Sequence, residues 1–304
     1  MNVSVIIPTY NAGPDFGEVL NRLWAQTVKP WEIIVLDSSS QDGTAAVAER
    51  MGARVTVIPQ RDFDHGGTRN RGAACSQGDI LMFMTQDAVP ADENLIEQFV
   101  GTLADPRVGG VYARQLPKEN ADILEKLSRS YNYPPISVAK TKEDLSKLGM
   151  KTFFYSNVCS AMRRDVFEEM EHFAEPVLFN EDMFMAAKCI IAGYSIVYNA
   201  DAKVYHSHQY NATQLMRRFF DNGVSLSKNS WIQAYTNVHH AGAGLVRMQL
   251  KELWRNRQWN WMLRLLIESG AKYIGFQLGT YHRLLPISIC SLLSLQPNRW
   301  RSTS

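Results

Sequence analysis

The stretch VSVIIPTYNAG occupies residues 3–13 and indicates how the first part of the chain folds. Its first five residues are mostly β-branched and carry no charge, which is typical of a strand that is buried on both faces. The polar residues 8–11 mark the point where this strand ends. Three more strands of similar composition are predicted at residues 32–36, 55–58 and 80–84.

Helices are predicted between these strands, at residues 15–26, 43–51 and 68–76; the first has Phe16, Val19, Leu20 and Leu23 at helical spacing. Buried strands separated by helices indicate an α/β fold with an open, doubly wound and mostly parallel sheet. The alternation weakens after about residue 105. The later elements predicted are loops at 131–135 and 140–151, a strand at 153–162, a helix at 180–192, strands at 195–198 and 203–205, and helices after residue 210.

Size and composition indicate an ordinary globular protein of 304 residues, with 45% hydrophobic and 20% charged residues. The N-terminus lacks the basic start and the cleavage site of a signal peptide. The apolar stretch 284–295 is short and contains Pro286, so no transmembrane helix is predicted. The four cysteines lack metal-ligand spacing and are predicted to be reduced core thiols. A cytoplasmic location is therefore expected.

The charge is distributed unevenly along the chain. Residues 1–200 contain 19 Lys and Arg against 26 Asp and Glu, whereas residues 201–304 contain 13 against 4. An acidic domain at residues 1–210, followed by a basic helical region at 211–304, is therefore predicted. Such a basic region suggests an anionic partner.

The basic region also carries aromatic and apolar residues that suit a membrane surface. Between Arg247 and Lys272, basic residues alternate with tryptophan and leucine. The residues in this mixture are Arg247, Leu250, Lys251, Leu253, Trp254, Arg255, Arg257, Trp259, Trp261, Arg264, Leu265, Leu266 and Lys272. Peripheral contact with the anionic inner face of a membrane is one interpretation. The other is that these helices pack on the first domain or form a homodimer contact.

Polar clusters follow three of the predicted strands, at residues 8–11, 37–40 and 85–87. In a doubly wound sheet these positions meet at one edge, where ligands bind. The turn PTYNAG at 8–13 lacks the glycine pattern of a nicotinamide-binding site, and the chain contains no Walker sequence. A nucleotide would therefore be held by side chains such as Asp37 and Arg69. Alternatively, Asp37 only caps a turn.

The ordered series of motifs resembles the inverting family-2 glycosyltransferases of GT-A fold. The series consists of VSVIIPTYN (3–11), EIIVLDSSSQDGT (32–44), FDHGGTRNRG (63–72), ILMFMTQDAVP (80–90), NEDMFMAAKCIIAGY (180–194) and VYHSH (204–208). The resemblance covers residues 1–210 and implies a nucleotide-sugar-binding catalytic domain. FDHGGTRN, TQDA and RRFFDNG (217–223) resemble the bacterial rhamnosyltransferase branch, which implies dTDP-L-rhamnose as the donor.

The resemblance also implies roles for individual residues. Asp37 and Thr9 would contact the nucleoside, and Gly66 and Arg69 would flank the ribose and the diphosphate. The full set expected to bind the donor is Pro8, Thr9, Tyr10, Asp37, Ser39, His65, Gly66, Arg69 and Gln86.

A divalent cation is implied by the D-x-D motif of the family, which falls on residues 85–87. Its first carboxylate is replaced by Thr85, so Asp87 is the one acidic ligand that remains, and His206 matches a position that completes the site in some relatives. Mg²⁺ or Mn²⁺ would suit such a site, because the leaving diphosphate carries negative charge that must be neutralised. Alternatively, His206 is a hydrogen-bonded histidine without a metal.

The carboxylates Glu181 and Asp182 open a predicted helix, and by resemblance Asp182 is the general base of an inverting transfer. Such a base takes the proton of the attacking hydroxyl and must lie within hydrogen-bond distance of it. The alternative is that either carboxylate caps the helix or interacts with its dipole.

The expected function is transfer of a sugar onto a hydroxyl of a growing cell-surface glycan, such as a lipid-linked O-antigen. The expected partners are the nucleotide-sugar donor, this glycan, the membrane surface and a second copy of the chain, but no nucleic acid. The alternatives are a UDP- or GDP-sugar donor, a nucleotidyltransferase, or a non-catalytic partner subunit. A nucleotidyltransferase would usually carry a basic residue in its first loop, and residues 8–13 contain none.

Overall fold

The computed structural model describes residues 1–236 and 242–300, which form two compact units. Unit 1 consists of Met1–Lys118, Tyr133–Pro176 and Glu181–His206, and unit 2 of Glu119–Asn132, Val177–Asn180 and the chain from Ser207 onward. The region predicted at 211–304 includes residues 237–241 and 301–304, which lie outside the described residues. The domain boundary at residue 210 stays a prediction.

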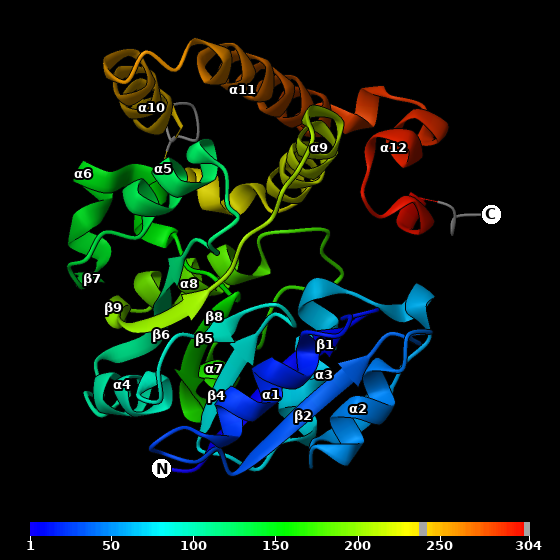
Figure 1. Cartoon of the computed structure of the whole chain (residues 1–304), viewed down its shortest axis with the longest axis vertical. Helices are drawn as coiled ribbons and strands as arrows, with labels where there is room; N and C mark the ends of the chain where they lie inside the picture. The colour runs from blue at the N-terminus through cyan, green and yellow to red at the C-terminus, as the bar shows by residue number, and fades with distance from the viewer. Residues whose placement is uncertain (237–241, 301–304) are drawn as a thin grey trace. The chain divides into compact units, whose positions relative to one another are not determined.

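Unit 1 is built on a nine-stranded sheet with the order β3-β2-β1-β4-β8-β6-β9-β5, in which β7 also pairs with β9 (Figure 1). The strands are β1 (Val3–Thr9), β2 (Glu32–Asp37), β3 (Arg54–Val57), β4 (Ile80–Met84), β5 (Val89–Pro90), β6 (Val108–Leu116), β7 (Val138–Lys140), β8 (Cys159–Arg163) and β9 (Ser195–Tyr205). The helices of this unit are α1 (Phe16–Trp24), α2 (Thr44–Arg50), α3 (His65–Cys75), α4 (Leu95–Leu103), α6 (Leu145–Leu148), α7 (Arg164–Glu169) and α8 (Glu181–Ile191).

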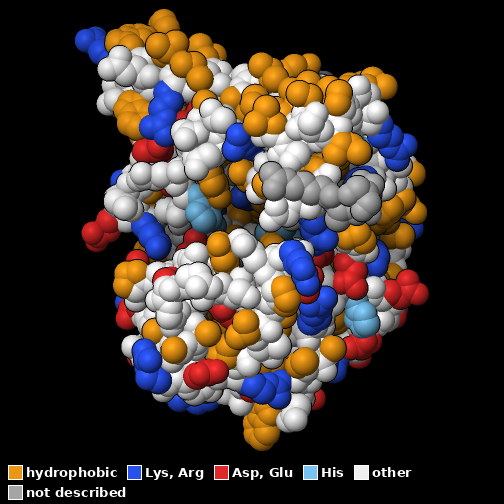
Figure 2. Space-filling model, turned by 90° about the vertical axis from the view of Figure 1, so that its right-hand side faces the viewer, with side chains coloured by type: hydrophobic (Ala, Val, Ile, Leu, Met, Phe, Trp, Pro, Cys, Tyr) orange, Lys and Arg blue, Asp and Glu red, His pale blue; other side chains and the backbone are white. Residues whose placement is uncertain are grey.

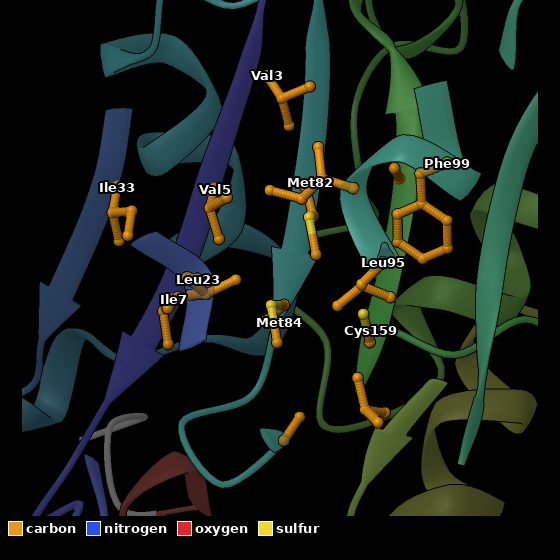
Figure 3. Close-up of a cluster of buried hydrophobic side chains, with 14 of the residues drawn as sticks. Val3, Val5, Ile7, Leu23, Ile33, Met82, Met84, Leu95, Phe99 and Cys159 are labelled. Atoms are coloured by element: carbon orange, nitrogen blue, oxygen red, sulfur yellow. The ribbon is translucent and has the colours of Figure 1, made fainter. Parts of the chain in front are cut away.

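The first four strands form the parallel half of the sheet, with β1 between β2 and β4. Alternate side chains of these strands face opposite sides, and each side is covered by helices. Figure 3 shows one side, where Val5, Ile33 and Met82 pack with Leu23 of α1 and Phe99 of α4. On the other side α3 lies close to β1, because a Cβ at Gly72 would come within 2.4 Å of an Ile6 methyl carbon. The doubly wound arrangement is therefore confirmed.

The second half of the sheet departs from the mostly parallel arrangement. Among the described strands, β8 runs antiparallel to β4 and β6, and β9 runs antiparallel to β5 and β7 but parallel to β6, so the sheet as a whole is mixed. The reason is where the chain enters β8. Thr85, just after β4, donates its N–H to the carbonyl of Val158, so β8 starts where β4 ends and must run in the opposite direction.

Several element predictions in this half were wrong. The strand predicted at 153–162 is limited to β8, because Phe153 ends a 3₁₀ helix and residues 154–158 form no strand. The two strands predicted at 195–198 and 203–205 are one continuous strand, β9. The loop predicted at 140–151 contains α6. Of the four cysteines, Cys75 at the end of α3 is exposed and the other three are buried, so the core prediction fails there.

Unit 2 is helical over its described residues, with α5 (Ile123–Asn132), α9 (Ala212–Lys228), α10 (Ala243–Arg255), α11 (Trp259–Thr280) and α12 (Ile287–Leu293). The segment RRFFDNG lies on α9, where the buried Asp221 accepts a hydrogen bond from the N–H of Leu295 at 2.9 Å. Gly223 of the same segment lies against the backbone of α11. Within the described ranges, no helix has both the length and the hydropathy that crossing a membrane requires.

Candidate active site

The first part of the site lies where β1 and β2 end side by side. Thr9 and Asp37 are paired in the β1–β2 register, and the Thr9 hydroxyl donates to Asp37 Oδ1 at 2.9 Å. Ser40 donates to the same carboxylate twice, from its hydroxyl to Oδ1 at 2.6 Å and from its N–H to Oδ2 at 2.8 Å. A carboxylate has about four acceptor positions. Asp37 therefore stabilises the turn after β2 and keeps one acceptor position on Oδ2 for a ligand donor such as a base N–H.

The loop after β4 is joined to the end of β1 by a side chain. Gln86 accepts from the N–H of Tyr10 at 2.8 Å and donates to the Tyr10 carbonyl at 3.2 Å. The Tyr10 ring itself is exposed, and Pro8 is the last residue but one of β1. Ser39 has a positive φ of 60° and donates its hydroxyl to the Ile58 carbonyl at 2.8 Å. These contacts fix the loops that surround Asp37.

The second part of the site lies at the start of α3. This helix is capped by Asp64, whose carboxylate accepts from the N–H of Gly67. Arg69, one turn into the helix, is buried, donates to the His65 carbonyl at 2.8 Å and forms an ion pair with Glu181 at 3.2 Å. Its Nε has no hydrogen-bond partner among the described residues. An unused buried donor is costly in an apolar interior, so this N–H suits an anionic ligand such as a phosphate.

Gly66 is explained by packing. A Cβ at this position would lie 2.0 Å from the carbonyl oxygen of Ala174, so no side chain fits there. Packing within the protein therefore requires a glycine at this position, and the donor contact expected of Gly66 stays a prediction.

Glu181 and Asp182 open α8 next to the loop that precedes β8. The Asn157 side-chain amide donates to Glu181 at 3.2 Å, and the Asn157 backbone N–H donates to Asp182 Oδ2 at 3.2 Å. Asp182 Oδ1 accepts from the N–H of Met183 at 2.8 Å, so this carboxylate also contributes to capping the helix. Glu181 is buried and Asp182 is half-buried.

The two carboxylates have pKa values that are shifted in opposite directions. Burial and, after it, the negative charge of the adjacent Glu181 together raise the pKa of Asp182 to about 7. Burial would also raise the pKa of Glu181, but Arg69, His65 and the Asn157 amide together hold it below its usual value. A neighbouring pair with separated pKa values is typical of acid–base sites. Asp182 is the member that can take a proton near neutral pH.

The third part of the site pairs Asp87, in the loop after β4, with His206 at the end of β9. Asp87 Oδ2 and His206 Nε2 lie 3.5 Å apart. On the other side of the ring, His206 Nδ1 lies 3.2 Å from Oε1 of Gln115. The NH₂ of Gln115 donates to Tyr133 and Ser156, so its oxygen faces the ring and accepts from Nδ1–H. In the neutral ring with its proton on Nδ1, the Nε2 lone pair is directed at the carboxylate.

Two acceptor atoms that face each other at this distance suit a cation between them. An imidazole whose other nitrogen donates to an amide oxygen is the usual arrangement of a metal-binding histidine. The residues Asp87 and His206 therefore fit a divalent metal ion of the Mg²⁺ or Mn²⁺ type.

Hydrogen bonds connect the second and third parts of the site. Gln115 of β6 contacts both His206 and Ser156, and Ser156 precedes Asn157, which holds Glu181 and Asp182. The pair Asp87 and His206 and the pair Glu181 and Asp182 are thus linked through buried polar residues of unit 1.

Comparison with known proteins identifies the family. The model of glycosyl transferase family 2 matches residues 4–171. The O-antigen chain rhamnosyltransferase RfbN of Salmonella typhimurium is 40% identical over 305 residues, which cover 99% of this chain and 97% of that protein. The O-antigen chain rhamnosyltransferase WbaN of Salmonella anatum is 38% identical, with coverage of 98% and 96%. This chain belongs to glycosyl transferase family 2.

Solved structures share the fold of this family 2 glycosyltransferase. A mannosyltransferase from Pyrobaculum calidifontis, in complex with GDP-Man and Mn²⁺, aligns with a TM-score of 0.63 and 18% identity, covering 93% of this chain and 88% of that one. A crystal structure of TarS 1–349 from S. aureus aligns with a TM-score of 0.55 and 14% identity, covering 93% and 91%. The predicted GT-A-like fold is confirmed.

Sequence reasoning missed three polar residues of the site in this glycosyltransferase. Gln115, Ser156 and Asn157 belong to none of the quoted motifs; Gln115 lies in a segment with no predicted element, and the other two lie inside the strand predicted at 153–162. The run YSN at 155–157 holds two small polar residues just before a buried strand, and this was the one local signal available.

Proposed function

We propose that this enzyme transfers L-rhamnose from dTDP-L-rhamnose, with inversion, to a hydroxyl of a growing cell-surface glycan. The observation that supports this most is identity of 38–40% with two O-antigen chain rhamnosyltransferases over 96–97% of their length. The aligned region spans nearly the whole chain, so it includes unit 2 as well as the segment that the family model matches. A UDP- or GDP-sugar donor is the alternative.

Asp182 is the proposed catalytic base. Its carboxylate takes the proton of the acceptor hydroxyl while that oxygen forms a bond to the anomeric carbon of the donor. The bond from that carbon to the diphosphate oxygen breaks, and dTDP leaves with the bonding electrons. The raised pKa of Asp182, about 7, suits a group that must accept a proton in neutral solution. Glu181 takes no proton in this scheme and positions Asp182 and Arg69.

The donor contacts are assigned by what each group can offer. Asp37 accepts from the thymine base, and Thr9 and Ser39 hold the turn that presents it. Arg69 donates its unpaired Nε–H to the diphosphate. Tyr10 and Gln86 fix the loop over the nucleotide, and Pro8, His65 and Gly66 shape the surrounding backbone.

Asp87 and His206 would hold a divalent cation, Mg²⁺ or Mn²⁺. When bound, the ion neutralises charge that develops on the diphosphate as it leaves. The proposed acceptor is a lipid-linked glycan, and the proposed place of the reaction is the cytoplasmic face of the membrane.

Donor choice can be measured by thermal shift of the purified protein with Mn²⁺. We expect dTDP-L-rhamnose to raise the melting temperature more than UDP-glucose or GDP-mannose, and each tenfold difference in affinity is worth about 1.4 kcal/mol. dTDP-glucose is the matched control, because it keeps the nucleotide and changes only the sugar. A larger stabilisation by UDP-glucose than by dTDP-L-rhamnose would refute the donor assignment.

The pH dependence tests the carboxylate pair. A base must be deprotonated, so transfer should fall as pH drops through about 7. Glu181→Gln removes the charge that raises the pKa of Asp182 and frees Arg69 to lower it, so the acid limb should move down by about one pH unit. Replacing the exposed Glu93 with Gln should leave the profile unchanged. An acid limb at the same pH in Glu181→Gln would show that the two carboxylates are not coupled.

A further inference from the structure

Helix α11 presents an apolar face to solvent. Its exposed apolar residues are Trp259, Leu263, Leu266, Ile267, Tyr273 and Ile274, each more than half exposed. Their spacing places them on one side of the helix. We call this set the α11 apolar face. Figure 2 shows that hydrophobic side chains gather along the upper edge of the molecule in that view.

The charged residues of α11 lie on its packed side, which is the reverse of an ordinary surface helix. Arg264 forms ion pairs with Glu268 at 2.7 Å and with Asp122, just before α5, at 2.9 Å. Glu268 is only 9% exposed, and burial lowers the pKa of Lys272. A surface helix of a globular protein turns its charges outward. In α11 the charged side chains form ion pairs within unit 2, and the apolar side chains are exposed to solvent.

The rotation of α11 about its axis is fixed by glycines. A Cβ at Gly275 would lie 2.1 Å from the Met216 carbonyl of α9, and one at Gly279 would lie 2.0 Å from the Phe220 carbonyl. Gly223 on α9 meets α11 in the same way, 2.3 Å from the Phe276 carbonyl. No other residue fits at these positions, so α11 cannot turn its apolar face toward α9.

The structure also corrects which residues of the tail are available to a membrane. Leu253 and Leu265 are buried together with Leu124 of α5, and Leu250 and Trp261 pack against them. Packing therefore accounts for these four. Trp254, by contrast, is 62% exposed and makes an edge-to-face contact with Trp259 at 5.0 Å. Trp259 and Leu266 belong to the α11 apolar face, and the other residues of that face were not recognised from the sequence.

The stretch of chain that carries the α11 apolar face is mostly positive. Residues 242–300 contain eight Lys and Arg and two acidic residues, Glu252 and Glu268. The exposed Arg255 and Arg257 precede the helix, and the exposed Arg283 follows it. If two copies paired through this face, cations would meet cations whether the helices ran parallel or antiparallel. A homodimer is therefore disfavoured, and an anionic surface is favoured.

We infer that the α11 apolar face binds the surface of a membrane that contains anionic lipid. The helix lies in the plane of the interface, with Leu263, Leu266 and Ile267 below the headgroups and Trp259 and Tyr273 at their level. Arg255, Arg257 and Arg283 contact lipid phosphates, which adds electrostatic attraction to the apolar contact. Further exposed apolar residues, Leu284, Ile287 and Leu292, follow α11 in the chain.

Vesicle flotation of the full-length protein tests this inference. We expect the protein to float with phosphatidylcholine vesicles that contain phosphatidylglycerol, and to be released as salt rises. Vesicles of phosphatidylcholine alone should bind it much less. The double variant Leu263→Gln/Ile267→Gln should lose roughly tenfold or more in vesicle affinity. Recovery of the wild-type protein in the vesicle-free fraction at low salt would overturn the inference.

Two control variants show whether vesicle binding depends on the α11 apolar face itself. The double variant Val57→Gln/Ile136→Gln changes similarly exposed apolar residues of unit 1 and should float like the wild type. Asp182→Asn should also float, because membrane binding does not depend on sugar transfer. Sedimentation equilibrium measures whether the protein is a monomer or a dimer in solution. A dimer that Leu263→Gln/Ile267→Gln converts to a monomer would mean that a second copy covers this face, and the inference would be wrong.

Discussion

Replacing Asp182 with asparagine should lower the turnover number for sugar transfer by about 10²–10⁴-fold, while donor binding changes little. The amide has nearly the same size and can still accept one of the two hydrogen bonds that come from Asn157 and Met183. It cannot take a proton from the acceptor hydroxyl. Steady-state transfer rates, together with the thermal shift produced by the donor, measure the two effects separately.

Asp165→Asn is the matched control for this variant. Asp165 lies in the first turn of α7 and accepts from the N–H of Val166 at 2.8 Å, so it caps a helix much as Asp182 does. It should keep nearly full activity. If Asp182→Asn were equally active, Asp182 would be a helix cap and the assignment of the base would be wrong.

Removing the divalent cation should lower the rate of transfer severely. A metal ion contributes several kcal/mol of charge stabilisation at a leaving diphosphate, so EDTA should lower the rate by roughly 10³-fold and Mg²⁺ or Mn²⁺ should restore it. Asp87→Ala should lose both this metal dependence and most of the donor affinity that the metal supplies. Transfer rates and donor binding are measured across a Mn²⁺ titration.

Asp105→Ala is the control for the metal variant, because Asp105 is a carboxylate of unit 1 that is paired with Arg107 at 2.7 Å. Its metal dependence should match the wild type. Full activity in EDTA would mean that Arg69 and helix dipoles neutralise the diphosphate without a metal, which is the outcome that the replacement at Thr85 would favour.

The parallel half of the fold could be predicted from sequence because its elements are local and continuous. The strands β1, β2, β3 and β4 differ from their predicted bounds by two residues or fewer at each end. Each is a short run rich in β-branched or large apolar residues, and each is bounded by polar residues or by a predicted helix. Such runs favour strands of a covered parallel sheet, in which β3 takes the edge and β2, β1 and β4 lie inside.

The second half resisted prediction because its strands are defined by distant partners. Strand β6 was not predicted, and it contains Gly109 and Gly110, a residue type that weakens the sequence signal of a strand. In the structure these glycines make room for aromatic rings, since a Cβ at Gly109 would lie 3.0 Å from Tyr194 and one at Gly110 would lie 3.1 Å from the Tyr155 hydroxyl. Residues far away along the chain therefore determine that this segment is a strand.

The candidate site divides in the same way. Thr9, Asp37, Gln86 and Asp87 follow predicted strands, and the sheet brings these strand ends together. Gln115 and Asn157 could not be found, because their contacts depend on the antiparallel β6–β8 pairing and on the entry of the chain into β8. The sequence also did not predict which side of α11 is exposed. Contacts of glycines with α9 orient this helix, and the spacing of its hydrophobic residues does not reveal them.

The most direct test of the proposed function is incorporation of radiolabelled L-rhamnose from dTDP-L-rhamnose into glycolipid. The acceptor is supplied by membranes from cells that lack this enzyme, with Mn²⁺ present. The account predicts label in organic-extractable glycan with the wild-type protein, and at most background label with Asp182→Asn. No label above a heat-inactivated control, or equal label with Asp182→Asn, would contradict it.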